Sequence, residues 1–175
     1  MIAPLAAAAL LLASAEARQF TPTRQPDAPY VPTPDSVVDA MLALAHVTSS
    51  DVVYDLGSGD GRIPIAAARQ HGARGVGIEM NSMLIQRSND NLKRAGVEDR
   101  VRFVYGDLFE TDISEATVVT LFLFPSLNER LIPKFRRELR PGTRIVSHHF
   151  DMGPGWPPEQ SQDVDGLMIY LWTIR

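Results

Sequence analysis

Residues 54–62, with the sequence YDLGSGDGR, carry the strongest chemical signal in this chain. Their three glycines follow a short β-rich run and precede a predicted helix, and glycines at such a turn let the backbone approach a ligand closely. The nicotinamide fingerprint G-x-G-x-x-G fails, because Arg62 stands at the position of its third glycine. Asp55 lies two residues before the first glycine instead. A carboxylate there would repel a pyrophosphate, but it suits a ligand with an ammonium or sulfonium group.

Two further acidic residues end the next two predicted strands. Glu79 closes a strand over residues 73–80, about 20 residues after the glycine turn, where a carboxylate can bind the hydroxyls of a ribose. Asp107 follows a strand over residues 101–105 and could accept a hydrogen bond from an adenine amino group. Three acids at three successive strand ends indicate a nucleoside with a positively charged tail. Ribose, adenine and sulfonium together predict S-adenosylmethionine as the cofactor.

The elements that must position these acids alternate along the chain. Apolar runs predict a strand beginning at Asp51 and further strands over residues 73–80, 101–105, 116–124, 143–150 and 167–174. Apolar spacing and glycine stops predict helices after Pro34 and over residues 62–71, 81–95 and 127–139. Several strands are apolar on both faces, which is typical of a parallel sheet covered on both sides. The predicted fold class is α/β, an open, doubly wound, mostly parallel sheet with helices on both faces.

With these motifs, the chain from about Tyr30 to Arg175 resembles the class I (seven-stranded) S-adenosylmethionine-dependent methyltransferases. The motifs DLGSGDGR, GIEMN and GDLFE look like that family's cofactor motifs. The resemblance implies a Rossmann-like methyltransferase fold in which the glycine motif wraps the methionine part, the acid of the second motif holds the ribose, and the third motif flanks the adenine. The implied cofactor residues are Asp55, Gly57, Ser58, Gly59, Glu79, Met80, Asp107 and Leu108.

A longer stretch, DLGSGDGRIPIAAA, together with the preceding Tyr-Val-Pro-Thr segment, is similar to a narrower group. These are small protein-lysine methyltransferases that act on the c-ring protein of mitochondrial ATP synthase and on the adenine nucleotide carrier. That resemblance implies a lysine amine as methyl acceptor, while a small-molecule acceptor stays open. Residues 122–126 (FLFPS) lack the (D/N)PPY signature of enzymes that methylate adenine or glutamine amino groups. The usual sixth strand must be abbreviated, near residues 160–165.

The catalytic candidates follow the predicted fourth and fifth strands. Methyl transfer from a sulfonium is an in-line displacement that needs no metal, so positioning and desolvation of the nucleophile dominate catalysis. A lysine amine must be neutral to attack, and a dry aromatic pocket lowers its pKa. Phe124, Pro125 and His148 are predicted to form that pocket, with a histidine or a carbonyl taking the proton. We expect no metal site, because neighbouring side chains of a strand point to opposite faces and separate His148 from His149.

The N-terminal region has a different composition from the rest. Residues 1–17 are an apolar, signal-like leader, residues 18–34 are a proline-rich extended lead-in, and residues 35–175 are the predicted methyltransferase domain. The apolar stretch is shorter than the ~20 residues of a membrane span. We therefore expect export to the periplasm or the medium with no stable membrane span after leader removal, or a cytoplasmic protein if the leader is not functional.

The amino-acid composition excludes several kinds of site and partner. The 175 residues are enough for one domain, and the absence of cysteine excludes disulfides and thiolate metal sites. The formal net charge of −4 provides no global field for nucleic acid, and no nucleic-acid partner is predicted. Tyr30 or Trp156 could cover the substrate, although Trp156 could equally pack at the sheet edge. Two rival functions remain at this level: a nicotinamide-dependent oxidoreductase, and a non-catalytic exported domain that keeps the fold.

Overall fold

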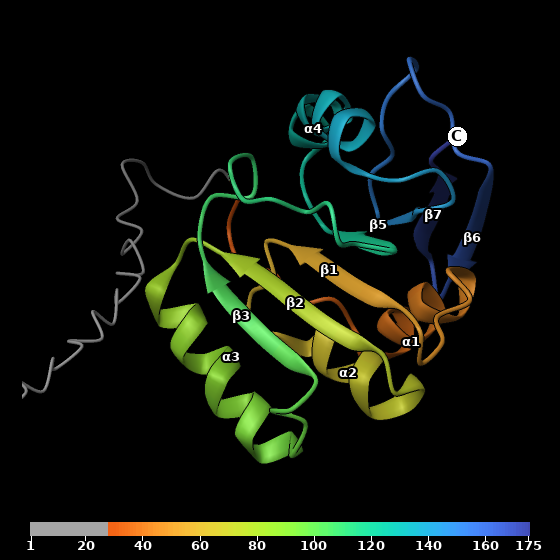
Figure 1. Cartoon of the computed structure of the whole chain (residues 1–175). Coiled ribbons are helices and arrows are strands. Elements are labelled where there is room, and N and C mark those ends of the chain that lie inside the picture. Colours follow the sequence, from red (N-terminus) through yellow and green to blue (C-terminus); the bar gives the residue numbers. More distant parts are fainter. Residues whose placement is uncertain (1–27) are drawn as a thin grey trace, which may run out of the picture.

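A seven-stranded sheet with the order β3-β2-β1-β4-β5-β7-β6 forms the centre of the molecule (Figure 1). The computed structural model describes residues 28–175, so the predicted leader and most of the lead-in lie outside the described residues. The first five strands are parallel, and β7 is antiparallel to both of its neighbours. This topology confirms the predicted doubly wound, mostly parallel sheet. The strands are β1 (Val52–Leu56), β2 (Arg74–Glu79), β3 (Val101–Tyr105), β4 (Val118–Leu121), β5 (Arg144–His148), β6 (Gln160–Val164) and β7 (Leu167–Thr173).

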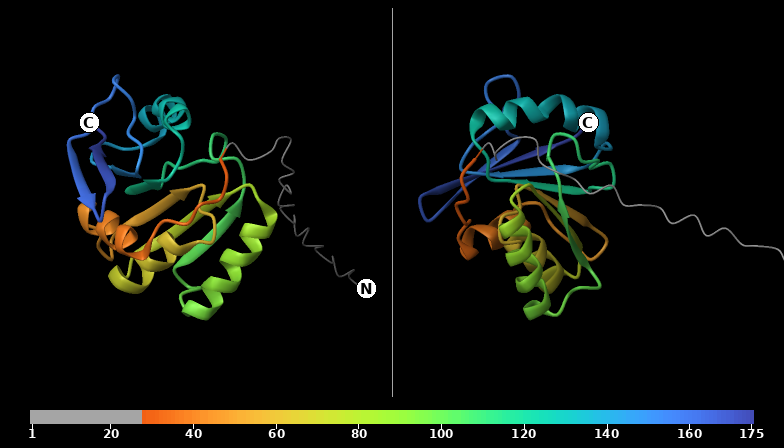
Figure 2. Two further views of the ribbon diagram at one scale, coloured as in Figure 1. Left: turned by 180° about the vertical axis from the view of Figure 1, so that it is seen from behind. Right: turned by 90° about the vertical axis from the view of Figure 1, so that its left-hand side faces the viewer.

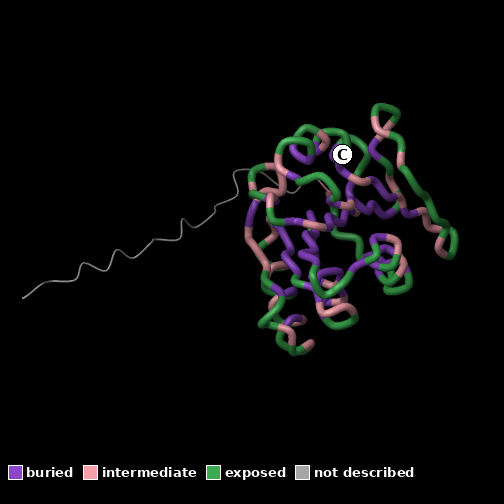
Figure 3. Tube along the Cα trace, turned by 45° about the vertical axis from the view of Figure 1, so that its right-hand side comes forward, coloured by how far each residue is buried: buried purple, intermediate pink, exposed green. Residues whose placement is uncertain are grey.

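Helices cover both faces of the sheet, but unequally. One face carries α1 (Asp35–Leu44), α2 (Arg62–His71) and α3 (Ser82–Ala95), and the other carries α4 (Pro125–Glu138) with loops beside it (Figure 2). The largest core cluster lies under α4, and a second lies between the sheet and α1 and α2. The central strands are accordingly buried along most of their length (Figure 3). No helix within residues 28–175 has the length and apolar character needed to cross a membrane.

Local sequence explains the helix ends that surround the site. Gly61 precedes α2 with φ of +79°, and Gly72 ends that helix in the left-handed conformation. Such backbone favours glycine because it lacks a Cβ atom. The Asn81 side chain accepts hydrogen bonds from the backbone N–H groups of Met83 and Leu84 and so caps α3. Gly61 and Asn81 therefore fix where α2 and α3 begin at the carboxyl edge of the sheet.

Two strands are shorter than the sequence predicted. The fourth was expected to reach residue 124, but β4 ends at Leu121. The chain leaves the sheet there because Pro125 opens α4, and a proline at the first helical position has no N–H to give to a strand. β5 ends at His148, since His149 has a positive φ of 70°. The abbreviated sixth strand, expected near residues 160–165, is β6.

Candidate active site

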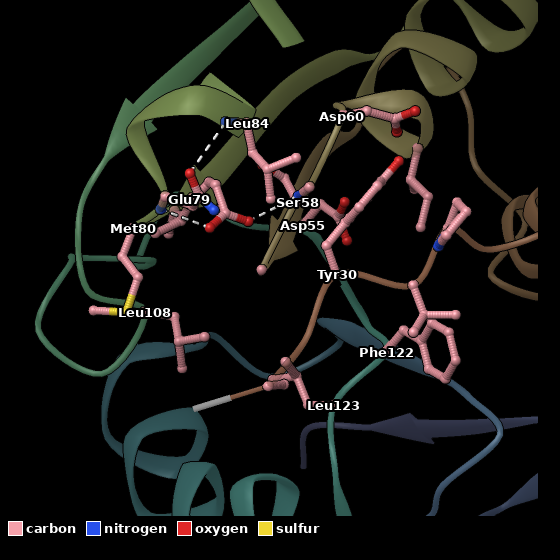
Figure 4. A pocket seen from close by; sticks show the side chains of 18 of the residues that line it. Tyr30, Asp55, Ser58, Asp60, Glu79, Met80, Leu84, Leu108, Phe122 and Leu123 are labelled. Atoms are coloured by element: carbon pink, nitrogen blue, oxygen red, sulfur yellow. Dashed lines mark hydrogen bonds between the residues drawn. The ribbon is translucent and has the colours of Figure 1, made fainter. Parts of the chain in front are cut away.

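A cavity of about 390 Å³ opens at the carboxyl ends of the parallel strands. The strand order reverses between β1 and β4, and ligands of open α/β sheets bind at such a switch point. The volume lies within the ~300–1,000 Å³ of small-molecule sites. Its walls are the glycine turn, the end of β2, the loop after β3, the residues after β4, and the segment before α1 (Figure 4). All eight predicted cofactor residues line this one cavity: Asp55, Gly57, Ser58, Gly59, Glu79, Met80, Asp107 and Leu108.

The glycine turn is held against the end of β2. The backbone N–H groups of Gly57 and Ser58 both donate to the carbonyl of Ile78, at 2.9 and 3.0 Å. Glu79 accepts a hydrogen bond from the Gly59 N–H at Oε2, 3.0 Å away, and one from the Asn81 N–H at Oε1, 2.8 Å away. The Glu79 carboxylate therefore lines the cavity and also holds the backbone of the glycine turn in place.

Asp55 is a buried carboxylate at the end of β1. Its Oδ1 accepts a 2.7 Å hydrogen bond from the Thr120 hydroxyl, and the two residues are paired in register on adjacent parallel strands. Burial raises the pKa of Asp55 to about 7; the Thr120 bond opposes this rise, and the negative charges of Glu79 and Asp60 add to it. A positively charged ligand would relieve the cost of ionising this group.

The loop after β3 forms the far wall of the cavity. Asp107 accepts a 2.8 Å hydrogen bond from the Phe109 N–H at Oδ1, and its carbonyl accepts from the N–H groups of Glu110 and Thr111. These bonds fix a tight turn that carries Leu108 into the wall. Figure 4 shows Leu108 and Met80 on the same side of the cavity. The turn thus places an apolar side chain and a carboxylate side by side in the cavity wall.

The three predicted catalytic residues do not line the cavity. Phe122 and Leu123 stand in the wall, whereas Phe124 and Pro125 lie at the start of α4, with Phe124 43% exposed. His148 lies behind the wall, with its ring centroid 4.0 Å from that of Phe122.

The surroundings of His148 determine its charge. Its Nδ1 lies 3.2 Å from the Thr33 hydroxyl, and its Nε2 has no hydrogen-bond partner among the described residues. Burial, with a smaller effect of His149, lowers the pKa of His148 to about 4. The His148 ring is therefore neutral at physiological pH. His149 is exposed and follows the end of β5, so strand alternation does not separate the two histidines as predicted; their ring centroids lie 6.2 Å apart.

Several residues at the site were not predicted. Thr120 is a polar residue inside the apolar run 116–124, and its register with Asp55 was the signal that could have found it. Asp60 and Arg62, inside the glycine motif, form an ion pair at the cavity wall. Of the two candidate covering residues, Tyr30 lines the cavity. Trp156 does not, and it packs against the core near β7, where its carbonyl accepts a hydrogen bond from the Trp172 indole.

The polar side chains of the cavity fit an adenosyl sulfonium. Two buried carboxylates face the space between the glycine turn and β2, and the buried Ser58 hydroxyl has no partner among the described residues. Carboxylates pair with ammonium and sulfonium groups and accept hydrogen bonds from ribose hydroxyls. Within residues 28–175, no group of three or more histidine, aspartate or glutamate side chains could hold a metal ion.

Comparison with known proteins gives one family. Residues 55–160 match the ANTKMT methyltransferase domain model. The chain is 49% identical over 154 residues to a protein-lysine N-methyltransferase of Saccharolobus islandicus, covering 85% of this chain and 95% of that protein. It is 34% identical over 144 residues to a lysine N-methyltransferase of Xenopus laevis that is named for an ATP synthase component, covering 81% of this chain and 62% of that protein.

A solved structure is more similar still. The chain is 60% identical to an RNA methyltransferase from Salinibacter ruber crystallised with S-adenosyl-L-homocysteine, with a TM-score of 0.81, covering 82% of this chain and 94% of that one. A methyltransferase from Geobacter sulfurreducens, 29% identical with a TM-score of 0.59, was also crystallised with that product; the match covers 66% of this chain and 48% of that one. These findings decide against the oxidoreductase and the non-catalytic domain. The chain belongs to the ANTKMT methyltransferase domain family and is an S-adenosylmethionine-dependent methyltransferase.

Proposed function

We propose that the eight cavity residues bind S-adenosylmethionine, with Asp55 towards its positively charged methionine end. The observation that carries this proposal is that all eight predicted residues line one cavity of suitable size. Glu79 binds the ribose hydroxyls, because each of its oxygens accepts one backbone N–H bond and keeps a second lone pair. Asp107 and Leu108 hold the adenine. The bound cofactor supplies a methyl group already activated on sulfur.

We propose that the methyl acceptor is a lysine amine of a protein. Two relatives at 49% and 34% identity are named for lysine methylation. The charge around the cavity disfavours an anionic acceptor, because four carboxylates line it: Asp55, Asp60, Glu79 and Asp107. Arg62 is the single arginine or lysine among the described lining residues, and it is paired with Asp60. A phosphate-bearing acceptor would meet mostly like charge near the reaction centre.

An aromatic row beside the cavity gives the three catalytic candidates a shared role. Phe122 packs on His148, and Phe150 lies 6.5 Å from Phe122 and 6.2 Å from Phe124 between ring centroids. We infer that this row desolvates the amine and lowers its pKa, and that Pro125 fixes the row by starting α4. His148 acts in the row as a neutral ring, because a group of pKa about 4 is a poor proton acceptor from lysine.

Mutation tests the row directly. Phe124→Ala and His148→Ala should lower kcat with S-adenosylmethionine saturating, and Phe124→Ala should leave the affinity for S-adenosylhomocysteine near that of the wild type. Unchanged turnover in both variants would remove them from the catalytic machinery.

Radiolabel transfer identifies the acceptor class. The full chain would be incubated with S-adenosylmethionine labelled in the methyl group and with protein, RNA and small-molecule fractions of a cell extract. Label recovered as methyl-lysine after acid hydrolysis of the protein fraction is the expected result. Asp55→Asn is the matched control, since its weaker cofactor binding should lower transfer to every acceptor alike when S-adenosylmethionine is well below saturation.

One observation favours a second acceptor class. The structure with 60% identity is described as an RNA methyltransferase, and α4 and the residues after it present four exposed arginines: Arg130, Arg136, Arg137 and Arg140. Label that is released by ribonuclease and absent from lysine would overturn the lysine proposal in favour of RNA.

A further inference from the structure

The segment Ala28–Thr33, which we call the strap, closes one side of the cofactor cavity. All six of its residues line the cavity, and Figure 4 labels Tyr30 among them. Ala28 packs against the core cluster that includes Leu123 and Leu127, and the strap ends at Pro34, where α1 begins. The strap therefore crosses the carboxyl edge of the sheet from the α4 side to the α1 side. It lies outside residues 55–160, the part that matches the family model.

Arg62 connects the strap to the glycine motif. Its Nη1 donates a 2.8 Å hydrogen bond to the carbonyl of Thr33. The same guanidinium binds Asp60 in a two-point fashion, with Nε 3.0 Å from Oδ1 and Nη2 2.8 Å from Oδ2. The Asp60 side chain is only 7% exposed. Two-point pairing orients a guanidinium rigidly, so Asp60 aims Arg62 at the strap.

Tyr30 places the strap directly on the glycine turn. A Cβ atom added to Gly59 would lie 2.7 Å from the Tyr30 ring, so the ring packs on the bare backbone of that residue. Burial raises the Tyr30 pKa, and the charge of the nearby Asp60 carboxylate raises it further. In Figure 4 the Tyr30 hydroxyl points towards Asp60. The guanidinium of Arg87 lies over the ring, 5.8 Å from its centroid.

The strap is stiff enough to act as a wall. Pro29 and Pro32 fix two of its six φ angles, and Pro34 fixes the angle at its junction with α1. A stiff segment loses little conformational freedom when it is held in place, so a few contacts suffice to close it. Thr33, whose carbonyl binds Arg62, has a second contact through its hydroxyl, which lies 3.2 Å from Nδ1 of His148.

We propose that Arg62 and Asp60 are positioning residues that hold the strap over the bound cofactor, and that Tyr30 is the strap's contact surface on the methionine side. The proposal rests on the cofactor site proposed above. The Arg62–Thr33 hydrogen bond and the packing of the Tyr30 ring on Gly59 then hold the product in place on this side of the cavity. The strap therefore controls how fast S-adenosylhomocysteine dissociates.

The dissociation rate of S-adenosylhomocysteine tests the strap in the full chain. Arg62→Gln breaks the bond to Thr33, and Tyr30→Ala removes the ring from Gly59. We expect each variant to release S-adenosylhomocysteine at least about tenfold faster in stopped-flow experiments, because changes at one interface act mostly on dissociation. Arg69→Gln is the matched control, since Arg69 is an exposed arginine on the same helix that does not line the cavity. It should keep the wild-type rate.

The outcomes separate the strap from the cofactor site. If Asp55→Asn binds S-adenosylmethionine as tightly as the wild type, the cofactor site is wrong. If Asp55→Asn loses affinity while Arg62→Gln and Tyr30→Ala keep the wild-type dissociation rate, the strap has no such role. Tyr30 is 38% exposed, so Tyr30→Ala tests the proposal even where Arg62→Gln fails to fold. Tyr30→Phe, which keeps the ring on Gly59, should restore most of the slow release lost in Tyr30→Ala.

Discussion

Asp55→Asn should make the ligand-free protein more stable while it weakens cofactor binding. Asp55 is buried and accepts a hydrogen bond from the Thr120 hydroxyl, and an asparagine oxygen can accept the same bond. The substitution therefore keeps the packing and removes only the charge. An enzyme site that favours a cation should show this opposition between stability and binding.

The magnitude follows from the pKa of Asp55. That pKa rises from its ordinary value of 3.8 to about 7, so the folded protein binds more protons than the unfolded chain between these values. The free energy of unfolding of the wild type therefore falls as the pH rises through this window, by at most about 4 kcal/mol above pH 7. If Asp55→Asn recovers half of this loss, its free energy of unfolding at pH 8.5 exceeds that of the wild type by about 2 kcal/mol, and its Tm is higher by roughly 4–8 °C.

Thermal unfolding at pH 5 and pH 8.5 measures this effect. The Tm advantage of Asp55→Asn should be larger at pH 8.5, and Asp90→Asn, a change at an exposed carboxylate of α3, should show none. Calorimetric titration at pH 8.5 should show a loss of about 10- to 100-fold in S-adenosylmethionine affinity, the value of a charge-assisted hydrogen bond. A variant that is less stable than the wild type by the same amount at both pH values would refute the reasoning.

Two further predictions concern neighbours of this carboxylate and the glycine turn. Thr120→Val should raise the Asp55 pKa, so that S-adenosylmethionine affinity begins to fall at a higher pH, and Thr120→Ser should restore the wild-type behaviour. Titration calorimetry from pH 6 to 9 measures this shift. An unchanged pH profile in Thr120→Val would rule out an effect of the hydrogen bond on Asp55. Gly61→Ala should destabilise the fold by more than about 2 kcal/mol, because the new Cβ would lie 2.3 Å from the Phe103 ring in addition to the cost of a positive φ. Gly96→Ala should cost only about 1 kcal/mol, from its positive φ, because no atom lies within 4 Å of the added Cβ. Equal urea midpoints for Gly61→Ala and Gly96→Ala would contradict the predicted clash at Gly61.

The sequence predicted the framework of the site because strand ends and glycine turns are local features. Asp55, Glu79 and Asp107 each end or follow an apolar run, and parallel strands bring such positions to one edge of the sheet. The same argument places the helix stops at Gly72 and Gly96. No tertiary information is needed for either, because the chirality and connection rules of α/β sheets leave little choice.

The remaining features depend on contacts between distant parts of the chain. Nothing near Thr33 in the sequence shows that its carbonyl binds Arg62 or that its hydroxyl meets His148, because these partners are 29 and 115 residues away. The catalytic candidates failed to reach the cavity wall for a local reason. The strand ends at Leu121, so Phe122 faces the cavity and Phe124 lies further along, at the start of α4.

The two sides of the cavity respond differently to the charge of the ligand. Asp55, Glu79 and Asp60 lie close enough that Glu79 and Asp60 both raise the Asp55 pKa, so these acids attract a cationic cofactor more than a neutral one. Methyl transfer removes the sulfonium charge, and the attraction by Asp55 weakens with it. The strap contacts depend on Arg62 and on the Tyr30 ring, neither of which needs a positive ligand. Discrimination between cofactor and product therefore belongs to the acids, while the strap slows the exchange of both, and the two functions can be altered separately by mutation.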